Sequence, residues 1–171
     1  MAGKLVQVAT STTDGSSQSV QVIGINTDDV YLVTYKGIQS ASHDRLRIRV
    51  TKSGSDDSTS NYDNARKGMP AGSSFQNNAD TNDGKFLLGT MDDLAGTGAQ
   101  GLIYCYNFNS SSEYSFVSFE TLMYASTPQL FGEIGGGVHT VASASDGLAL
   151  QTNSANNLVA GGVVTLYKVV S

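Results

Sequence analysis

The chain has 171 residues, of which 39% are hydrophobic and only 15% charged, and its formal net charge is −5. This length is enough for one domain with a buried core and is short for two, so we expect a single domain over residues 1–171. The negative charge, with a pI of about 4.7, disfavours a polyanionic partner, and we therefore expect no nucleic-acid binding.

The first residues lack the basic and then apolar pattern of a signal peptide. No apolar run approaches the roughly 20 residues that a membrane helix needs. The only cysteine is Cys105, which excludes an intrachain disulfide framework. We expect a protein that is made in a cytoplasm without a signal peptide and that does not insert into a membrane.

Short alternating segments separated by Gly, Ser, Asn and Asp follow one another from the N-terminus. The first predicted strands are Lys4–Thr10, Ser19–Ile25 and Val30–Ile38. The third is apolar on both faces and fits a central strand. The next, Asp44–Thr51, has the clearest alternation, with a period of two that indicates a half-buried strand. Its aliphatic residues face one way (Leu46, Ile48, Val50) and its arginines face the other (Arg45, Arg47, Arg49).

Residues 52–84 form a long polar region dominated by Ser, Asp, Asn and Gly. An unstructured loop of this length would be unusual in a compact domain. We expect one short irregular strand around Asn61–Lys67, flanked by long excursions.

Further strands are predicted in the second half of the chain, at Lys85–Thr90, Gly101–Phe108, Tyr114–Ala125, Pro128–Phe131, Val138–Ala144, Gly147–Gln151 and Gly162–Val169. Tyr114–Ala125 also fits a helical spacing, but its Ser, Thr and aromatic content favours a strand. The glycines Gly135–Gly137 are predicted to form a flexible joint, and Asp146-Gly147 a hairpin turn.

About ten short strands, no helix and only two prolines indicate an all-β protein. The pattern is typical of an antiparallel jelly-roll β-sandwich, and a closed barrel is the second choice.

The sequence contains no recognisable catalytic motif, and we predict neither an enzyme nor a cofactor. His43 and His139 are the only histidines, and no Gly-x-Ser-x-Gly elbow accompanies them. A hydrolase would need a cleft that contains one of these histidines. For His139, which follows the glycines at the start of a predicted strand, we expect a surface or turn position. Cys105 lies mid-strand between two tyrosines, which predicts a buried inert thiol.

Two acidic segments, Ser53–Asp63 and Asn77–Gly84, carry the oxygen ligands that hard cations prefer. The second loosely echoes a calcium loop, with Asp80, Asn82 and Asp83 as weak candidate ligands. Gly84 falls one place late, however, and no Glu closes the loop. We therefore predict solvated loops rather than a metal site.

Two sets of side chains could form an interaction surface. The arginine stripe Arg45, Arg47 and Arg49 could meet an acidic partner or an anionic glycan, or it could be a solvated face paired with acidic residues. Tyrosines such as Tyr104 and Tyr106, predicted to share a face with Phe108, suit either a core or sugar and protein contact.

The order of several segments resembles the β-rich virion proteins of tailed bacteriophages, especially marine and cyanobacterial ones. The resemblance is carried by Leu46–Arg49, by Ser60–Tyr62, by Ile103–Phe108 and by the ending Asn157–Tyr167. It implies a jelly-roll module used in a tail fibre, a tail tip or a capsid decoration. Lys168 departs from such endings, which often carry Gly at that place.

We therefore expect a non-enzymatic structural protein of the virion that acts in particle assembly or host attachment. Its partners would be other virion proteins, further copies of itself, with a trimer expected for a fibre, and a host-surface glycan. A lectin-like carbohydrate-binding module is the alternative. The last strand is apolar on both faces, so the region around Tyr167 is predicted to be either central in a sheet or a subunit contact.

Overall fold

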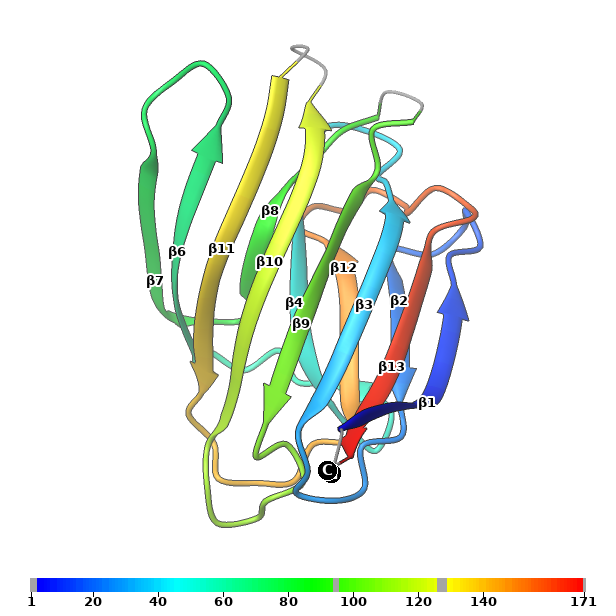
Figure 1. Ribbon diagram of the computed structural model, residues 1–171, viewed down its shortest axis with the longest axis vertical. Coiled ribbons are helices and arrows are strands. Elements are labelled where there is room, and N and C mark those ends of the chain that lie inside the picture. The colour runs from blue at the N-terminus through cyan, green and yellow to red at the C-terminus, as the bar shows by residue number, and fades with distance from the viewer. Residues whose placement is uncertain (1–2, 94–95, 126–128, 171) are drawn as a thin grey trace.

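The fold is all-β and consists of two antiparallel sheets in a sandwich-like arrangement (Figure 1). The computed structural model describes residues 3–93, 96–125 and 129–170. Thirteen strands and no helix occur in these residues, which confirms the predicted antiparallel β class. Each sheet keeps free edges within these ranges, so the chain does not form the single closed barrel that was our second choice.

The large sheet has eight strands. Their order across the sheet is β1 (Lys4–Thr12), β13 (Val163–Val170), β3 (Tyr31–Ile38), β9 (Ala99–Tyr106), β10 (Ser115–Ala125), β11 (Gln129–His139), β6 (Tyr62–Pro70) and β7 (Gln76–Asp83). The small sheet has five, in the order β2 (Ser19–Ile23), β12 (Gly147–Thr152), β4 (Asp44–Lys52) and β5 (Ser55–Asp56), with β8 (Phe86–Met91) also paired to β4.

The core lies between the two sheets and follows the alternation of the strands. Leu46, Ile48 and Val50 of β4 are fully buried, as their period of two predicted. Across the core, β10 buries Val117, Phe119 and Met123. Strand β10 coincides with Tyr114–Ala125, so the choice of strand over helix there is confirmed.

The expected joint at Gly135–Gly137 is wrong, because these glycines lie inside the continuous strand β11. Gly135 and Gly137 face the core, where a Cβ would lie 2.5 Å from the Ala65 carbonyl oxygen and 2.6 Å from the Phe86 ring. The glycines therefore permit close packing, not flexibility. Of the two strands expected on either side of the joint, Pro128 lies outside the described residues.

The expected hairpin at Asp146-Gly147 is also wrong, since β11 and β12 belong to different sheets. The Asp146 carboxylate instead accepts hydrogen bonds from the Thr51 hydroxyl (2.6 Å) and the Gly54 N–H (2.9 Å). Asp146 thus links the connection between β11 and β12 to the turn between β4 and β5.

Residues 52–84 are more regular than expected, because they contain β5, β6 and β7. Strand β6 starts near the predicted place but runs to Pro70, and β7 pairs with it from Gly68 to Tyr62. Strand β7 carries no large apolar residue, which is why hydrophobic alternation could not reveal it.

The close packing at the glycines of β11 generates a stability prediction. Gly137→Ala should lower the free energy of unfolding by about 1–3 kcal/mol, because the new methyl group meets the Phe86 ring and the Asp63 carbonyl oxygen. Urea denaturation measures this change. Gly3→Ala is the matched control, since its Cβ meets only the Val170 carbonyl oxygen at 3.5 Å. Equal stability of the two variants would contradict the close-packing role.

Candidate functional site on the outer face of the large sheet

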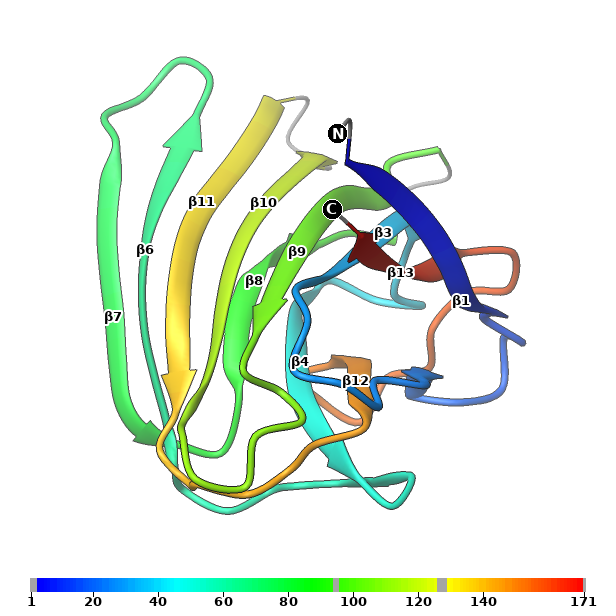
Figure 2. The ribbon, with the colours of Figure 1, turned by 60° about the horizontal axis from the view of Figure 1, so that its bottom comes forward.

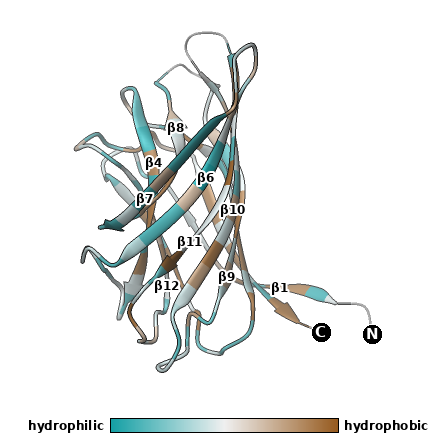
Figure 3. Ribbon diagram, turned by 90° about the vertical axis from the view of Figure 1, so that its left-hand side faces the viewer, coloured by the Kyte–Doolittle hydropathy of each residue, from teal (hydrophilic) through white to brown (hydrophobic). Residues whose placement is uncertain are grey.

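The outer face of the large sheet is the most distinctive surface of the molecule. Strand β10 alternates between a buried inner row and an outer row, and its outer row carries Phe116, Leu122 and Tyr124 with the polar Ser118 and Glu120 between them. Residues of this outer row and of β11 beside it are large, hydrophobic and 44% to 56% exposed: Phe116, Leu122, Tyr124, Leu130 and Ile134. Figure 3 shows hydrophobic segments along the same strands.

The pairing register brings these side chains together. Tyr124 of β10 lies opposite Leu130 of β11, and Glu120 lies between Ile134 on one side and Leu102 of β9 on the other. Leu122 lies opposite Gly132. Because Gly132 has no side chain, the side chains of Leu122 and Met69 both border the space above it. We call this surface, carried by β9, β10 and β11, the large-sheet outer face.

A groove of about 360 Å³ lies in the large-sheet outer face. Its walls include Met69, Leu102, Leu122 and Ile134, with Glu120 among the few polar groups. A second hollow of about 320 Å³ adjoins it. This second hollow is lined by Leu102, Tyr104, Tyr106, Ser118, Phe119, Glu120, Ile134 and Gly135. Such a mainly apolar, open surface suits contact with another molecule better than bond-making chemistry.

The predicted aromatic row splits at the end of β9. Tyr104 and Tyr106 lie half-buried on the outer face, with their ring centroids 6.4 Å apart, and the Tyr106 hydroxyl is 3.3 Å from that of Ser118. Phe108 is fully buried instead. Asn107 between them adopts a positive φ of 59°, which turns the chain and ends the strand alternation.

The predicted interaction residues do not form one surface. Tyr167 is half-buried on β13 of the large sheet, opposite Gln7 and Leu32. Arg45, Arg47 and Arg49 lie on the small sheet, on the side of β4 that faces away from the core.

The arginine stripe is only partly solvated. Each arginine is half-buried, and the Arg49 Nε donates to the Gly84 carbonyl oxygen at 2.8 Å. Burial, reinforced by the neighbouring Arg49 charge, lowers the pKa of Arg47. Among the described residues no carboxylate lies within 4.0 Å of these three side chains, so they form no direct ion pairs, although Asp44, Asp56 and Asp83 act on Arg47 electrostatically and partly offset the lowering of its pKa.

The weak calcium candidates all lie on β7 and are engaged otherwise. The Asp80 carboxylate is 2.6 Å from the Arg66 guanidinium, and that of Asp83 is 2.9 Å from the Lys85 ammonium. The Asn82 N–H donates to the Asp63 carboxylate at 2.7 Å. In the described parts of the chain, no three His, Cys, Asp or Glu side chains gather in a group that could hold a metal ion.

The two histidines and the cysteine lie apart from the large-sheet outer face. His43 is exposed in the connection before β4, with Nδ1 3.7 Å from the Asp92 carboxylate. Cys105 is buried in the core, which raises the pKa of its thiol. The burial of Cys105 agrees with the buried position that the sequence predicted.

His139 is fully buried, contrary to the surface or turn position that we expected for it. Its Nε2 lies 3.4 Å from the Asp57 carboxylate, and its ring is 4.6 Å from that of Tyr62. Burial and the nearby Lys52 charge lower the pKa of His139. The residue therefore belongs to the packing at the end of β11, where the chain crosses between the sheets.

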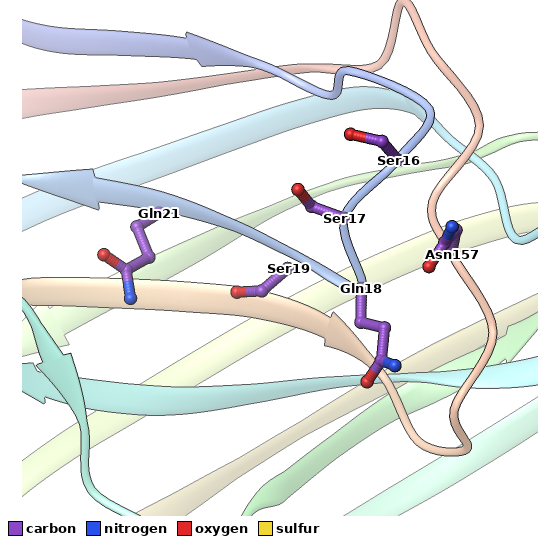
Figure 4. A pocket seen from close by; sticks show the side chains of 6 residues that line it. All are labelled: Ser16, Ser17, Gln18, Ser19, Gln21 and Asn157. Carbon is purple, nitrogen blue, oxygen red and sulfur yellow. The ribbon is translucent and has the colours of Figure 1, made fainter.

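A separate polar hollow of about 540 Å³ lies beside β2 (Figure 4). Ser16, Ser17, Gln18, Ser19, Gln21 and Asn157 line it. Its side chains are neutral, and Gln21 is held by a hydrogen bond to Asp56. It offers hydrogen bonds but no apolar platform, so it is the weaker candidate for a contact site.

Comparisons of the chain with known protein families, with curated proteins and with solved structures gave no match. Among the described residues, no helix is long and apolar enough to cross a membrane.

The large-sheet outer face was not predicted from the sequence, although the strand that carries it has large apolar residues on both sides. Tyr114–Ala125 is apolar on both faces, as Val30–Ile38 is. On the side of β3 that faces away from the core, Leu32 is buried, whereas on the corresponding side of β10 Leu122 is exposed. Only the packing distinguishes a covered second face from an open one.

The burial of His139 predicts a pH dependence of stability. Because its folded pKa lies below the unfolded value of about 6.5, the unfolded chain binds the proton more readily. The free energy of unfolding should therefore fall as the pH decreases below about 6.5, by at most about 1.4 kcal/mol per pH unit. Urea denaturation between pH 7.5 and roughly 5 measures this slope.

His139→Gln should flatten the slope, whatever its effect on absolute stability. His43→Gln, which alters the exposed histidine, is the matched control and should keep the slope. A slope that survives His139→Gln would assign the titration to another group.

Proposed function

We propose that this chain is a non-enzymatic structural protein of a tailed-phage particle, in a tail fibre, a tail tip or a capsid decoration, and that it docks through the large-sheet outer face. The observation that carries the docking role is the cluster of exposed large apolar residues on β10 and β11. The virion assignment rests on the sequence resemblance alone.

The composition of the face supports a protein contact. Contiguous exposed apolar surface is uncommon on soluble monomers and marks interaction sites. Aromatic residues are enriched at the centres of such interfaces, and here Phe116 and Tyr124 stand among aliphatic neighbours. Glu120 is the exposed carboxylate within the groove, so a partner meets little charge there.

The chemistry of the groove supports a non-enzymatic role. Glu120 and Glu133 both border it, but Glu133 occupies the inner row of β11 and lies beside Arg66. The two carboxylates therefore face opposite sides of the sheet, unlike the paired acids of a hydrolase. Both histidines and Cys105 lie elsewhere.

The jelly-roll class is part of the same proposal. The chain crosses repeatedly between the sheets, as from β1 to β2 to β3 to β4 and again from β11 to β12 to β13. Such crossings are typical of Greek-key and jelly-roll sandwiches. The unequal sheets, of eight and five strands, would make this an expanded member of the class.

Mass spectrometry of purified particles tests the virion role. If the protein is absent from particles of the phage that encodes it, the proposal is overturned. Leu122→Glu tests the face. A charge buried in an apolar interface should reduce the copies per particle at least about tenfold, equivalent to about 1.4 kcal/mol. Val159→Glu, at an exposed position outside the sheets, is the matched control. Normal incorporation of Leu122→Glu would remove the face from the contact.

A carbohydrate-binding role is the second candidate, because one part of the face combines stacking and hydrogen-bonding groups. Tyr104 and Tyr106 line a hollow together with Ser118 and Glu120. Glycan-array binding that is lost in Tyr104→Ala and retained in Leu130→Ala would favour this function over protein docking. No glycan binding by the intact chain would exclude it.

A further inference from the structure

Strand β1 forms one edge of the large sheet and offers an open pairing surface. In the described residues it pairs only with β13, so no strand forms a ladder along its other edge; β2 of the small sheet lies near its C-terminal part, where the Ser11 hydroxyl donates to the Gln21 carbonyl oxygen at 2.6 Å. Figure 2 shows β1 at the margin of the sheet, on the opposite side from β7, and Figure 3 shows its N-terminal end projecting from the body. The strand is nine residues long, and its backbone groups along the free edge remain available to another strand.

The side chains of β1 do not protect this edge. Leu5 is 52% exposed, and Val6 and Val8 are similarly open. The strand has no proline and a single charge, Lys4. The opposite edge, β7, differs because it consists of Gln, Asn, Ala, Thr and two aspartates. Charged and polar edges discourage strand addition, whereas long apolar ones favour it.

The bulge at Val8 defines how much of the edge can pair. The register with β13 shifts between Gln7 and Ala9, and the Val8 side chain packs on Gly24 of the chain after β2. A bulge bends a strand and ends regular pairing. Lys4–Gln7 is therefore the straight segment that remains accessible at the edge.

We propose that two copies of this chain join through these segments, antiparallel about a two-fold axis at Val6. In this register Val6 meets the partner's Val6, and Leu5 lies beside the partner's Gln7. The half-buried Tyr167 and Val169, which lie opposite Gln7 and Leu5 within each chain, extend the apolar contact. The two large sheets become one continuous sheet across the dimer.

Charge and symmetry favour a second copy in this position. Lys4 of each chain lies at opposite ends of the paired segment, and the Lys168 ammonium nearby is neutralised by Asp29 at 2.6 Å. Pairing of β1 with β7 of another copy would set Leu5 and Val6 against Asn and Asp side chains. It would also generate an open chain of copies instead of a closed pair.

This inference uses a different edge from the large-sheet outer face and does not depend on the proposed function. It replaces the trimer expected from the sequence, because antiparallel edge pairing relates two copies and not three.

Light scattering of the full chain across a concentration series tests the proposal. We expect a limiting mass of twice 17.9 kDa. Val6→Glu should shift the dissociation constant at least about tenfold, since two carboxylates then oppose each other at the axis. Within each chain the substituted position lies opposite Lys168, so the pairing of β1 with β13 is retained. Circular dichroism of Val6→Glu verifies that the chain is folded.

Leu122→Glu is the control for the contact, because it alters the outer face and leaves β1 unchanged; its mass should equal that of the unmodified chain. A monomer of 17.9 kDa at all concentrations, a mass of three times that value, an open-ended series, or a dimer that Val6→Glu leaves intact would each overturn the two-fold pairing. Failure of Leu122→Glu to affect particle incorporation would bear only on the docking face.

Discussion

Two sheets of unequal width share one core, and this mismatch determines what each part of the large sheet can bury. Eight strands lie over five, so the small sheet covers the middle of the large one and not its full span. Strand β8 packs beneath β10, β11 and β6 and closes the core on that side. Beyond it, β6 and β7 extend past the small sheet (Figure 2). Strand β7 is largely exposed, so an apolar row on its inner side would remain in water.

The inner face of this overhang is accordingly ionic. Arg66 of β6 is almost completely buried, and its Nη1 donates to the side-chain Oδ1 of Asn64 (2.7 Å) and to the Asp80 carboxylate (2.6 Å). The Glu133 carboxylate lies 3.5 Å from Arg66 Nε, and burial raises the pKa of Glu133. Buried charges stabilise a fold only when they are paired, so loss of one partner costs about 3–5 kcal/mol. The cluster thereby connects the polar strand β7 to the core.

The sequence predicted those strands in which buried apolar side chains alternate with exposed ones. The alternation of Leu46, Ile48 and Val50 located β4, and the apolar ending located β13. Strand β7 escaped because its stability comes from backbone pairing with β6 and from Asp80 bound to Arg66, neither of which leaves a hydrophobic period. Gly137 was misread for the same kind of reason. The sequence does not distinguish a glycine that leaves room for the Phe86 ring from a glycine that allows the chain to bend.

The candidate site was harder to predict than the fold, because exposure of an apolar row depends on what lies across from it. Tyr167 was singled out correctly as lying on a doubly apolar strand, yet β13 lies second from the edge, between β1 and β3. Its outer row is continued by Leu32. The regular arginine stripe predicted an interaction surface, but it lies on the small sheet. The sequence alone does not show which strands belong to which sheet, so it could not assign these residues to separate outer faces.

The two outer faces of the sandwich differ in a way that stability alone does not require. On the small sheet, Arg47 and Arg49 lie opposite Gln151 and Ala149, so that half-buried charged side chains occupy its outer face. On the large sheet the equivalent positions carry Leu122, Tyr124 and Leu130, which are left exposed. A row of charged side chains like that on the small sheet would permit the same strand pairing in the large sheet and would expose less apolar surface to water. The retained apolar row therefore points to a contact outside the chain, and the charged row on the opposite sheet limits that contact to one side of the molecule.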